Sequence, residues 1–253
     1  MTSGIMTYEA TRRVETSVRT FTIVEHLDQA GPSRVSAIAA DLDISKGIVH
    51  NHLSTLRELG YVCKVDDQYQ LSAKFLQLGQ RVRTQSPLYR AAHSLVGPYA
   101  RRVETGVVLY APAGREAIVI DTHGLPASLD LAVGASQPLT ATLAGVVICL
   151  ESEGDVAADS VYDGDALASQ LDADGIITGR LSAAVSTQAC SVPITTESGD
   201  CLGSLAVLLS PEDDRESIYE SVDALRDQIE RRHGGSESAE RSFATEKHAW
   251  IDS

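Results

Sequence analysis

The most constraining feature of the sequence is the succession of apolar patterns between residues 12 and 71. Apolar residues recur every three or four positions in three consecutive stretches, which is the spacing of amphipathic helices. The first stretch ends at Gly31-Pro32, and the second is followed at once by Asp43-Ile44, which reads as a tight turn. We therefore expect a helix over residues 12–30, a short second helix and, after the turn, a third.

Side chains that cap helices support this division. Ser33 precedes the second stretch and Ser45 precedes the third, and a serine at this position accepts hydrogen bonds from free amide groups of the first turn. The third helix is expected to run to Leu59, because Gly60 suits the left-handed conformation that ends many helices.

The period changes after Gly60. Residues 61–65 and 69–71 alternate in polarity, and Asp66-Asp67 separates them, which predicts a two-stranded hairpin. The order is thus helix, short helix, tight turn, helix and hairpin. The chain continues with residues 74–104, which are mostly helical in pattern and contain breaks expected at Ser86-Pro87 and Gly97-Pro98.

Strands and helices are mixed in the remainder, which makes the whole chain α+β. Strands are expected at 107–110, 117–121, 128–133, 190–195 and 202–209, and helices at 142–151, within 156–174 and at 212–232. The polar sequence from Gly234 onward is expected to be mobile.

Charge is distributed unevenly over a chain with a net charge of −14. Residues 1–90 hold 11 Lys and Arg against 9 Asp and Glu, whereas residues 91–253 hold 10 against 26. An acidic protein is a poor candidate for binding nucleic acid, but the acidity lies outside the helical N-terminal segment. The Asp-rich, Lys-poor composition suggests a high-salt cytoplasm, although an acidic protein encoded by a GC-rich genome can have the same composition.

Other classes of function find little support in the sequence. The four cysteines form no Cys-x-x-Cys pair and no zinc spacing with histidine, so we expect no metal, disulfide or cofactor. No apolar run has the roughly 18 residues of a membrane span, and the N-terminal residues lack the pattern of a secretory signal. We expect a cytoplasmic protein that does not contact the membrane.

The third predicted helix carries the clearest functional pattern. At about 100° per residue, its apolar side chains share one sector. The opposite face holds hydrogen-bond donors and small residues, as a helix that enters the DNA major groove requires. On this helix and beside it, the candidate DNA-binding residues are Arg34, Ser45, Lys46, Gly47, His50, Asn51, Ser54, Arg57 and Lys64. Taken alone, the helix favours an ordinary solvated face, but the order of segments reverses that preference. His52 falls on the apolar side and is interpreted as a packing residue.

The sequence resembles the IclR family of transcriptional regulators along nearly its whole length. In the first half the resemblance rests on residues 34–62 and on the wing segment Tyr69-Gln-Leu71. Within residues 34–62, the third helix begins with the motif Ser-Lys-x-x-Val-His and ends with Leu-x-x-Leu-x-x-x-Gly-Tyr-Val. In the second half it rests on residues 137–145, on Asp174-Gly175, and on the segments 192–194 and 203–211.

The resemblance implies a domain organisation and a set of partners. It implies a winged helix-turn-helix DNA-binding domain over residues 10–73, a linker helix over 74–90, a GAF-like α/β effector-binding domain over 91–233 and a polar tail over 234–253. The implied partners are double-stranded DNA with a pseudo-palindromic operator, an unidentified small-molecule effector, and a second copy of the chain in a homodimer, with a tetramer left open.

The second half departs from the family pattern at positions that usually carry polar side chains. Ala189 stands where a pocket cysteine is common, with Cys190 one place along, and Val207 and Leu209 stand at hydroxyl-bearing positions. These losses imply a more apolar pocket. Arg180 is either a replacement anchor for an anion or a solvated loop charge. The candidate effector residues are Leu139, Thr142, Leu143, Ala144, Gly145, Arg180 and Cys190, although residues 142–145 also fit tight helix packing.

Two other classes of function remain as alternatives. His123 and Asp121 with Cys149 or Cys190 contain the residue types of a thiol enzyme, but no nucleophile motif surrounds either cysteine. A protein-interaction module whose winged helix does not bind DNA is the second alternative, because the N-terminal charge balance is close to neutral.

Overall fold

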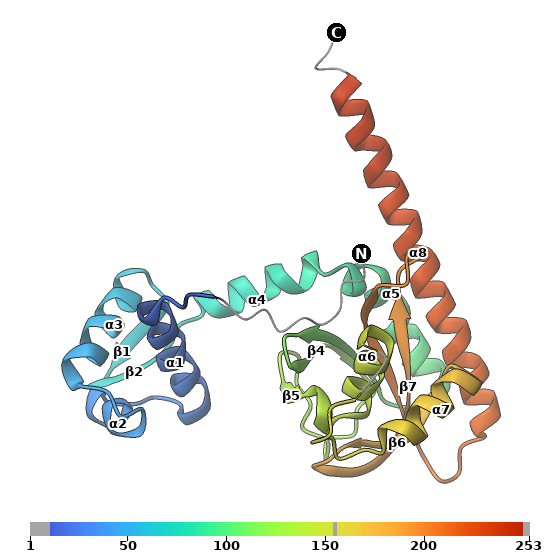
Figure 1. Cartoon of the computed structure of the whole chain (residues 1–253), viewed down its shortest axis with the longest axis horizontal. Helices are drawn as coiled ribbons and strands as arrows, with labels where there is room; N and C mark the ends of the chain where they lie inside the picture. The colour runs from blue at the N-terminus through green and yellow to red at the C-terminus, as the bar shows by residue number, and fades with distance from the viewer. Residues whose placement is uncertain (1–10, 154–155, 250–253) are drawn as a thin grey trace. The chain divides into compact units, whose positions relative to one another are not determined.

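The computed structural model describes residues 11–153 and 156–249, with backbone only from residue 236 onward. Contacts divide this chain between residues 83 and 84 into two compact units. The N-terminal unit contains α1 (Glu15–Ala30), α2 (Val35–Asp41), α3 (Lys46–Glu58), β1 (Val62–Val65), β2 (Gln68–Leu71) and most of α4 (Lys74–Gln85). The helix–turn–helix–hairpin order predicted from the sequence is confirmed (Figure 1).

One apolar cluster holds the N-terminal unit together. Ile23 of α1, Ile38 of α2 and Leu53 of α3 are fully buried in it, and the wing contributes Val62 and Tyr69. The wing strands pair in antiparallel register from Val62↔Leu71 to Val65↔Gln68.

The expected capping role of Ser33 is wrong. Its backbone instead pairs with Tyr69, with N–H···O distances of 2.9 and 2.8 Å, and its hydroxyl donates to the Gly31 carbonyl at 3.0 Å. Arg34 occupies the N-cap position of α2 without a side-chain hydrogen bond. Pairing with the wing competes with capping for Ser33, and the strand contact prevails.

The C-terminal unit is built on a six-stranded antiparallel sheet in the order β5-β4-β3-β8-β7-β6. Its strands are β3 (Val107–Ala113), β4 (Glu116–His123), β5 (Ser136–Pro138), β6 (Ile177–Ser182), β7 (Val185–Thr195) and β8 (Cys201–Leu209). Its helices are α5 (Pro87–Val103), the 3-10 turn η1 (Leu139–Ala141), α6 (Leu143–Glu153), α7 (Gly164–Asp174) and α8 (Arg215–Ala249).

Helices cover both faces of this sheet. Side chains of α5 and α8 pack with Val192, Leu205 and Val207 on one face. Side chains of η1, α6 and α7 pack with Val108, Ala189 and other strand residues on the opposite face. The α+β class, with an N-terminal winged helix-turn-helix and a C-terminal sheet domain, is therefore confirmed.

Several predicted elements differ from those observed. Pro98 lies inside α5 and does not break it, because Val96, Tyr99 and Ala100 are buried along the same helix. Residues 128–133 form no strand. Leu129 and Leu131 alternate in burial because they pack under the α6 face of the sheet, and the edge strand is the later β5. Strand β6 was not expected. Helix α8 extends beyond Arg232 to Ala249.

Candidate nucleic-acid interface and effector site

Local interactions at Ser45 and Gly60 define the two ends of α3. The Ser45 hydroxyl accepts a hydrogen bond from the Ile48 amide at 3.3 Å, as the capping pattern predicted. At the other end, Gly60 has a φ of +79°, a conformation that glycine adopts without steric cost. Together these residues set the length of the helix and therefore which side chains share each face.

The apolar face of α3 packs into the N-terminal core. Val49 and Leu53 are fully buried and Leu56 nearly so, whereas Leu59, the expected last residue of the helix, is 54% exposed. His52 is half-buried, and its Nδ1 lies 2.9 Å from the Thr20 hydroxyl of α1. His52 thus joins α1 to α3, which agrees with its interpretation as a packing residue.

The opposite face of α3 is exposed along its whole length. The predicted residues Ser45, Lys46, Gly47, His50, Asn51, Ser54 and Arg57 are all exposed, and α3 brings them together. A Cβ built on Gly47 would meet nothing within 4 Å, so this position faces open space. An exposed helix with amide, imidazole, hydroxyl and cationic groups on a single face has the chemistry needed to hydrogen-bond base edges.

Arg34 and Lys64 lie beside α3 on other segments. Arg34 is exposed at the start of α2, and Lys64 is exposed on β1. Lys64 is already paired, because its Nζ lies 2.7 Å from Oδ1 of Asp67 in the hairpin turn. This hydrogen bond raises the pKa of Lys64 and lowers the pKa of Asp67. Asp67 was not among the residues predicted from the sequence, although a spacing of three residues across a hairpin turn indicates such a pair.

Most of the candidate effector residues meet at the start of α6. Leu139, Thr142, Leu143 and Ala144 are buried there. The Thr142 hydroxyl accepts a hydrogen bond from the Gly145 amide at 2.9 Å, so Thr142 caps the first turn of α6. A Cβ on Gly145 would lie 2.7 Å from the Leu139 carbonyl carbon and closer still to its oxygen. These contacts describe tight helix packing, one of the two interpretations left open by the sequence.

The structure does not bring Cys190 to this group. Cys190 faces α5 and α8 with Val207 and Leu209, whereas Ala189 faces α6. The expected hydroxyl-bearing positions Val207 and Leu209 therefore lie on the wrong face of the sheet for a pocket at α6. Neighbouring strand residues point to opposite faces, so a shift of one position reverses the assignment.

Arg180 lies on the edge strand β6 and is exposed. Its carbonyl oxygen accepts a hydrogen bond from the Tyr162 hydroxyl at 2.8 Å. Partial burial raises the pKa of Tyr162 to about 12. The backbone of Arg180 is thus part of the framework beside α6, whereas its guanidinium faces solvent.

Two buried hydroxyl groups on the α6 face were not singled out by the sequence. Tyr110 of β3 and Ser204 of β8 are cross-strand partners, and both side chains are completely buried. Neither hydroxyl has a hydrogen-bond partner in the part of the chain that the structure describes. Burial raises the pKa of Tyr110, so this phenol stays neutral and can donate a hydrogen bond.

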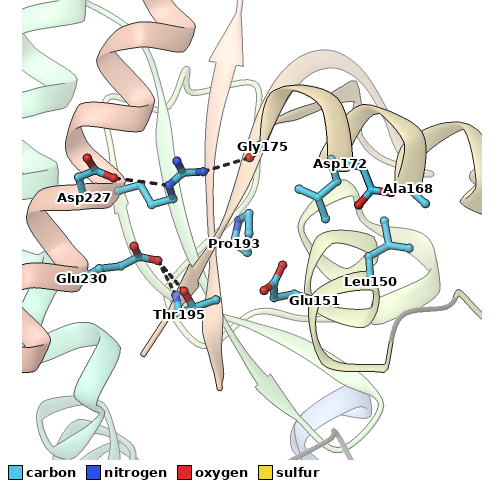
Figure 2. Close-up of a pocket in the computed structure, with 11 residues that line it drawn as sticks. Leu150, Glu151, Ala168, Asp172, Gly175, Pro193, Thr195, Asp227 and Glu230 are labelled. Carbon is cyan, nitrogen blue, oxygen red and sulfur yellow. Dashed lines mark hydrogen bonds and ion pairs between the residues drawn. The ribbon is translucent and has the colours of Figure 1, made fainter. Parts of the chain in front are cut away.

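An open cleft of about 520 Å³ lies near the far end of α6, between α7, α8 and the end of β7 (Figure 2). Arg226 donates to the Gly175 carbonyl at 3.2 Å, and Glu230 accepts from the Thr195 amide and hydroxyl at 2.8 and 2.9 Å. The cleft is lined by Leu150, Glu151, Ala168, Leu171, Asp172, Gly175, Pro193, Thr195, Arg226, Asp227 and Glu230.

Carboxylates outnumber cations in this cleft. Glu151, Asp172, Asp227 and Glu230 face a single guanidinium, that of Arg226. Burial and then the charge of Glu230 raise the pKa of Glu151. The lining repels anions, so the cleft does not suit an anionic effector.

Of the two cysteines considered for a thiol enzyme, Cys149 is buried and Cys190 lacks the required activation, because burial raises the pKa of Cys190 to about 12. Burial also raises the pKa of Cys201, which was not a candidate, to about 11. A nucleophilic cysteine needs the opposite shift. His123 Nε2 does lie 3.4 Å from Asp121 Oδ2. Among the side chains that the structure describes, no three His, Cys, Asp or Glu residues group closely enough to hold a metal ion.

Comparison with known proteins identifies the N-terminal unit. Residues 17–66 match the family model described as the IclR helix-turn-helix domain. The probable HTH-type transcriptional regulator ArcR of Halobacterium salinarum is 23% identical over 124 residues, which cover 44% of this chain and 47% of ArcR. The match spans about half the length of this curated relative.

Solved structures resemble the whole chain at low sequence identity. The IclR transcriptional regulator of Alicyclobacillus acidocaldarius has a TM-score of 0.71 at 17% identity and covers 88% of this chain and 98% of its own. IclR of Thermotoga maritima has a TM-score of 0.63 at 19% identity, covering 88% and 100%. An IclR homologue of Microbacterium hydrocarbonoxydans, solved with 4-hydroxybenzoate, has a TM-score of 0.69 at 17% identity, covering 86% and 98%.

The fold and the exposed face of α3 define a winged helix-turn-helix protein with a separate α/β sheet domain. More particularly, residues 17–66 match the IclR helix-turn-helix domain, and the described chain has the same fold as solved IclR transcriptional regulators. None of the helices that the described residues form is long and apolar enough to cross a membrane.

Proposed function

We propose that this chain is a sequence-specific DNA-binding transcriptional regulator in which α3 reads the major groove. The observation that carries the proposal is the uninterrupted exposed polar face of α3, set opposite a buried apolar face within a winged helix-turn-helix. Asn51 is proposed to pair with an adenine edge, and Lys46 and Arg57 to contact guanine or phosphate. Gly47 permits a close approach of the backbone to DNA.

The remaining candidates flank this helix. Ser45 and His50 belong to its N-terminal part, which lies nearest the bases in helix-turn-helix complexes, and Ser54 continues the same face. Arg34 and Lys64 are proposed to lie along the phosphate backbone. Their contacts would position the protein on DNA without carrying sequence information.

A homodimer is proposed because several large apolar side chains are exposed to solvent on α1 and α4, where their contact with water is unfavourable. Phe21 of α1 is 62% exposed, and Leu76 and Val82 of α4 are 73% and 69% exposed. Val14 and Val18 extend the apolar surface of α1, with exposures of 65% and 42%. Large apolar side chains left exposed on two helices of one unit are candidates for a protein contact. A dimer would place two copies of α3 in successive major grooves, about 34 Å apart, on a pseudo-palindromic operator.

The C-terminal domain is proposed to sense a small molecule near the start of α6. The support comes from the shared fold with the Microbacterium hydrocarbonoxydans protein that was solved with 4-hydroxybenzoate. The buried hydroxyls of Tyr110 and Ser204 offer neutral hydrogen-bonding groups on the same face of the sheet. The proposed division is residues 10–73 for DNA, 74–90 as the linker that transmits the effector signal, 91–233 for the effector and 234–253 as a tail.

The test of DNA reading is selection of bound duplexes from a random-sequence library with the full chain, followed by affinity measurements. We expect one enriched motif, and at least a tenfold loss of affinity for it in Asn51→Ala and Lys46→Ala. Gln29→Ala, an exposed amide removal on α1, serves as the control and should bind like the unaltered protein. If no motif is enriched and no duplex binds, an interaction module without DNA binding becomes the better proposal.

A regulator without catalytic activity, acting in the cytoplasm where the DNA lies, completes the proposal. The raised pKa values of Cys190 and Cys201 support the absence of a thiol nucleophile. Iodoacetamide at pH 7.5 should label neither residue rapidly in the folded protein. Fast labelling of a single buried cysteine would favour the enzyme alternative.

A further inference from the structure

The tip of the wing is acidic, which is unusual for a surface next to DNA phosphates. Strands β1 and β2 are joined by the two-residue turn Asp66-Asp67. Within this turn, Asp67 Oδ1 lies 2.7 Å from Lys64 Nζ, and the side chains of Lys64 and Asp67 are 34% and 80% exposed. The only lysine of the wing thus has its charge balanced by its nearest carboxylate.

The Lys64–Asp67 pair interacts electrostatically with cations from two further segments. Lys64 comes from β1, Arg34 from the start of α2 and Arg57 from the last turn of α3. The charge of Arg34 contributes to the lowered pKa of Asp67, after the larger effects of Lys64, and the charge of Arg57 acts against the protonation of Lys64. Each charge of the Lys64–Asp67 pair therefore interacts with an arginine, and one of these arginines belongs to the proposed recognition helix.

We propose that Asp67 restrains the attraction of the wing to the DNA backbone by holding the ammonium group of Lys64. A phosphate that approached Lys64 would have to replace the Asp67 carboxylate, and it would also meet the negative charge of Asp67 itself. Both effects oppose sequence-independent binding, which depends almost entirely on contacts between cations and phosphates. The inference rests on the proposed DNA-binding function and assigns the wing a role in limiting it.

The backbone of the turn allows this role to be tested without changing the shape of the wing. Asp66 and Asp67 have φ values of 47° and 66°, in the left-handed region. Asparagine adopts this region at least as readily as aspartate and is common in such hairpin turns. Asp67→Asn and Asp66→Asn therefore remove the same charge from adjacent positions of one turn, and only Asp67 makes the contact with Lys64.

The test measures the affinity of the full chain for a random-sequence 30-bp duplex between 50 and 300 mM KCl. Asp67→Asn should bind about three- to tenfold more tightly than the unaltered protein at the lowest salt. The slope of log K against log salt should become steeper by about one unit per protomer, as one more phosphate contact requires. Asp66→Asn should gain less than half of that increase.

Lys64→Met completes a double-mutant cycle that isolates the contact. The gain in affinity that Asp67→Asn produces in the unaltered background should be absent when Lys64 is replaced by Met. Equal gains from Asp67→Asn and Asp66→Asn, or an equal effect of Lys64→Met in both backgrounds, would overturn the inference. If no variant binds DNA at any salt concentration, the proposed function itself fails.

Discussion

Gly145 lies in the first turn of α6, directly against the backbone of Leu139, where a side chain has no space. We predict that Gly145→Ala destabilises the protein by about 1–3 kcal/mol, because the added methyl group forces rigid backbone apart. Urea unfolding monitored by circular dichroism measures the change. A variant with unaltered stability would show that α6 and η1 separate easily, as a ligand site at this position would allow.

Gly47 provides the matched contrast, since a Cβ at this position meets nothing within 4 Å. We predict that Gly47→Ala stabilises the folded protein by up to about 1 kcal/mol, the difference in helix propensity between the two residues. The same variant should bind the selected DNA motif more weakly, because the methyl group separates α3 from the base edges. Weakened binding without the gain in stability would point instead to a distorted helix.

The sequence correctly predicted which residues share the exposed face of α3, whereas it misassigned the faces of residues on the strands. Seven candidates from Ser45 to Arg57 share an exposed face, because helical periodicity places residues over many positions and tolerates small errors. The strand assignments of Cys190, Val207 and Leu209 depended on alignment to a single residue. A displacement of one place moves a side chain to the other face of the sheet, and composition does not reveal it.

At the scale of elements, the exposed apolar side chains of α1 and α4 predict self-association. We predict that Phe21→Ser and Leu76→Ser each weaken the homodimer at least tenfold while leaving thermal stability of the monomer nearly unchanged, because both side chains are mostly exposed within the chain. Sedimentation velocity at several concentrations measures the change. Val133→Ser in the C-terminal unit, at a residue 46% exposed, is the control and should retain the dimer.

The elements themselves were predictable where local pattern and packing agree. The first three helices and the wing follow from apolar spacing, Ser45 and Gly60, all of which act locally. Pro98 misled the sequence analysis because buried neighbours keep α5 helical despite the missing amide. Residues 128–133 were predicted as a strand because their burial alternates, but no neighbouring strand of the described chain pairs with them. Whether such a segment pairs depends on a partner strand, which its own sequence does not reveal.

At the scale of the whole molecule, thiol and phenol groups with raised pKa values make the free energy of unfolding decrease at alkaline pH. The pKa of Cys190 is raised to about 12 and those of Cys201 and Tyr162 to about 11 and about 12, so the folded state favours their protonated forms. This stabilisation is complete below the unfolded pKa values, near 8.5 for thiols, and is lost as pH rises through the folded values.

We therefore predict a melting temperature that is constant between about pH 7 and 8 and falls progressively above about pH 9. Cys190→Val, which keeps an apolar side chain in the α5 and α8 cluster, should reduce the fall. Differential scanning calorimetry at pH 7 to 11 measures it. An identical decline in the unaltered protein and in Cys190→Val would assign the alkaline loss to other groups.

The division of charge between the two halves of the chain was readable from the sequence, and the structure adds where the charges lie. The carboxylates around Glu151 and Glu230 gather in the cleft of Figure 2, drawn together from α6 and α8 by the fold. No spacing in the sequence links residues 79 positions apart, so this cleft could not be predicted. The Lys64–Asp67 pair could be, since one hairpin turn brings both residues together.

The turn at Asp66-Asp67 also has a consequence for how such a regulator evolves. Aspartate and asparagine codons differ by one base, and both residues fit the positive φ values found there. A single transition in the gene thus changes the charge of the wing while the hairpin keeps its form. One base change can therefore adjust the sequence-independent DNA affinity of such a regulator to a different ionic strength. The residues of the proposed recognition helix stay the same.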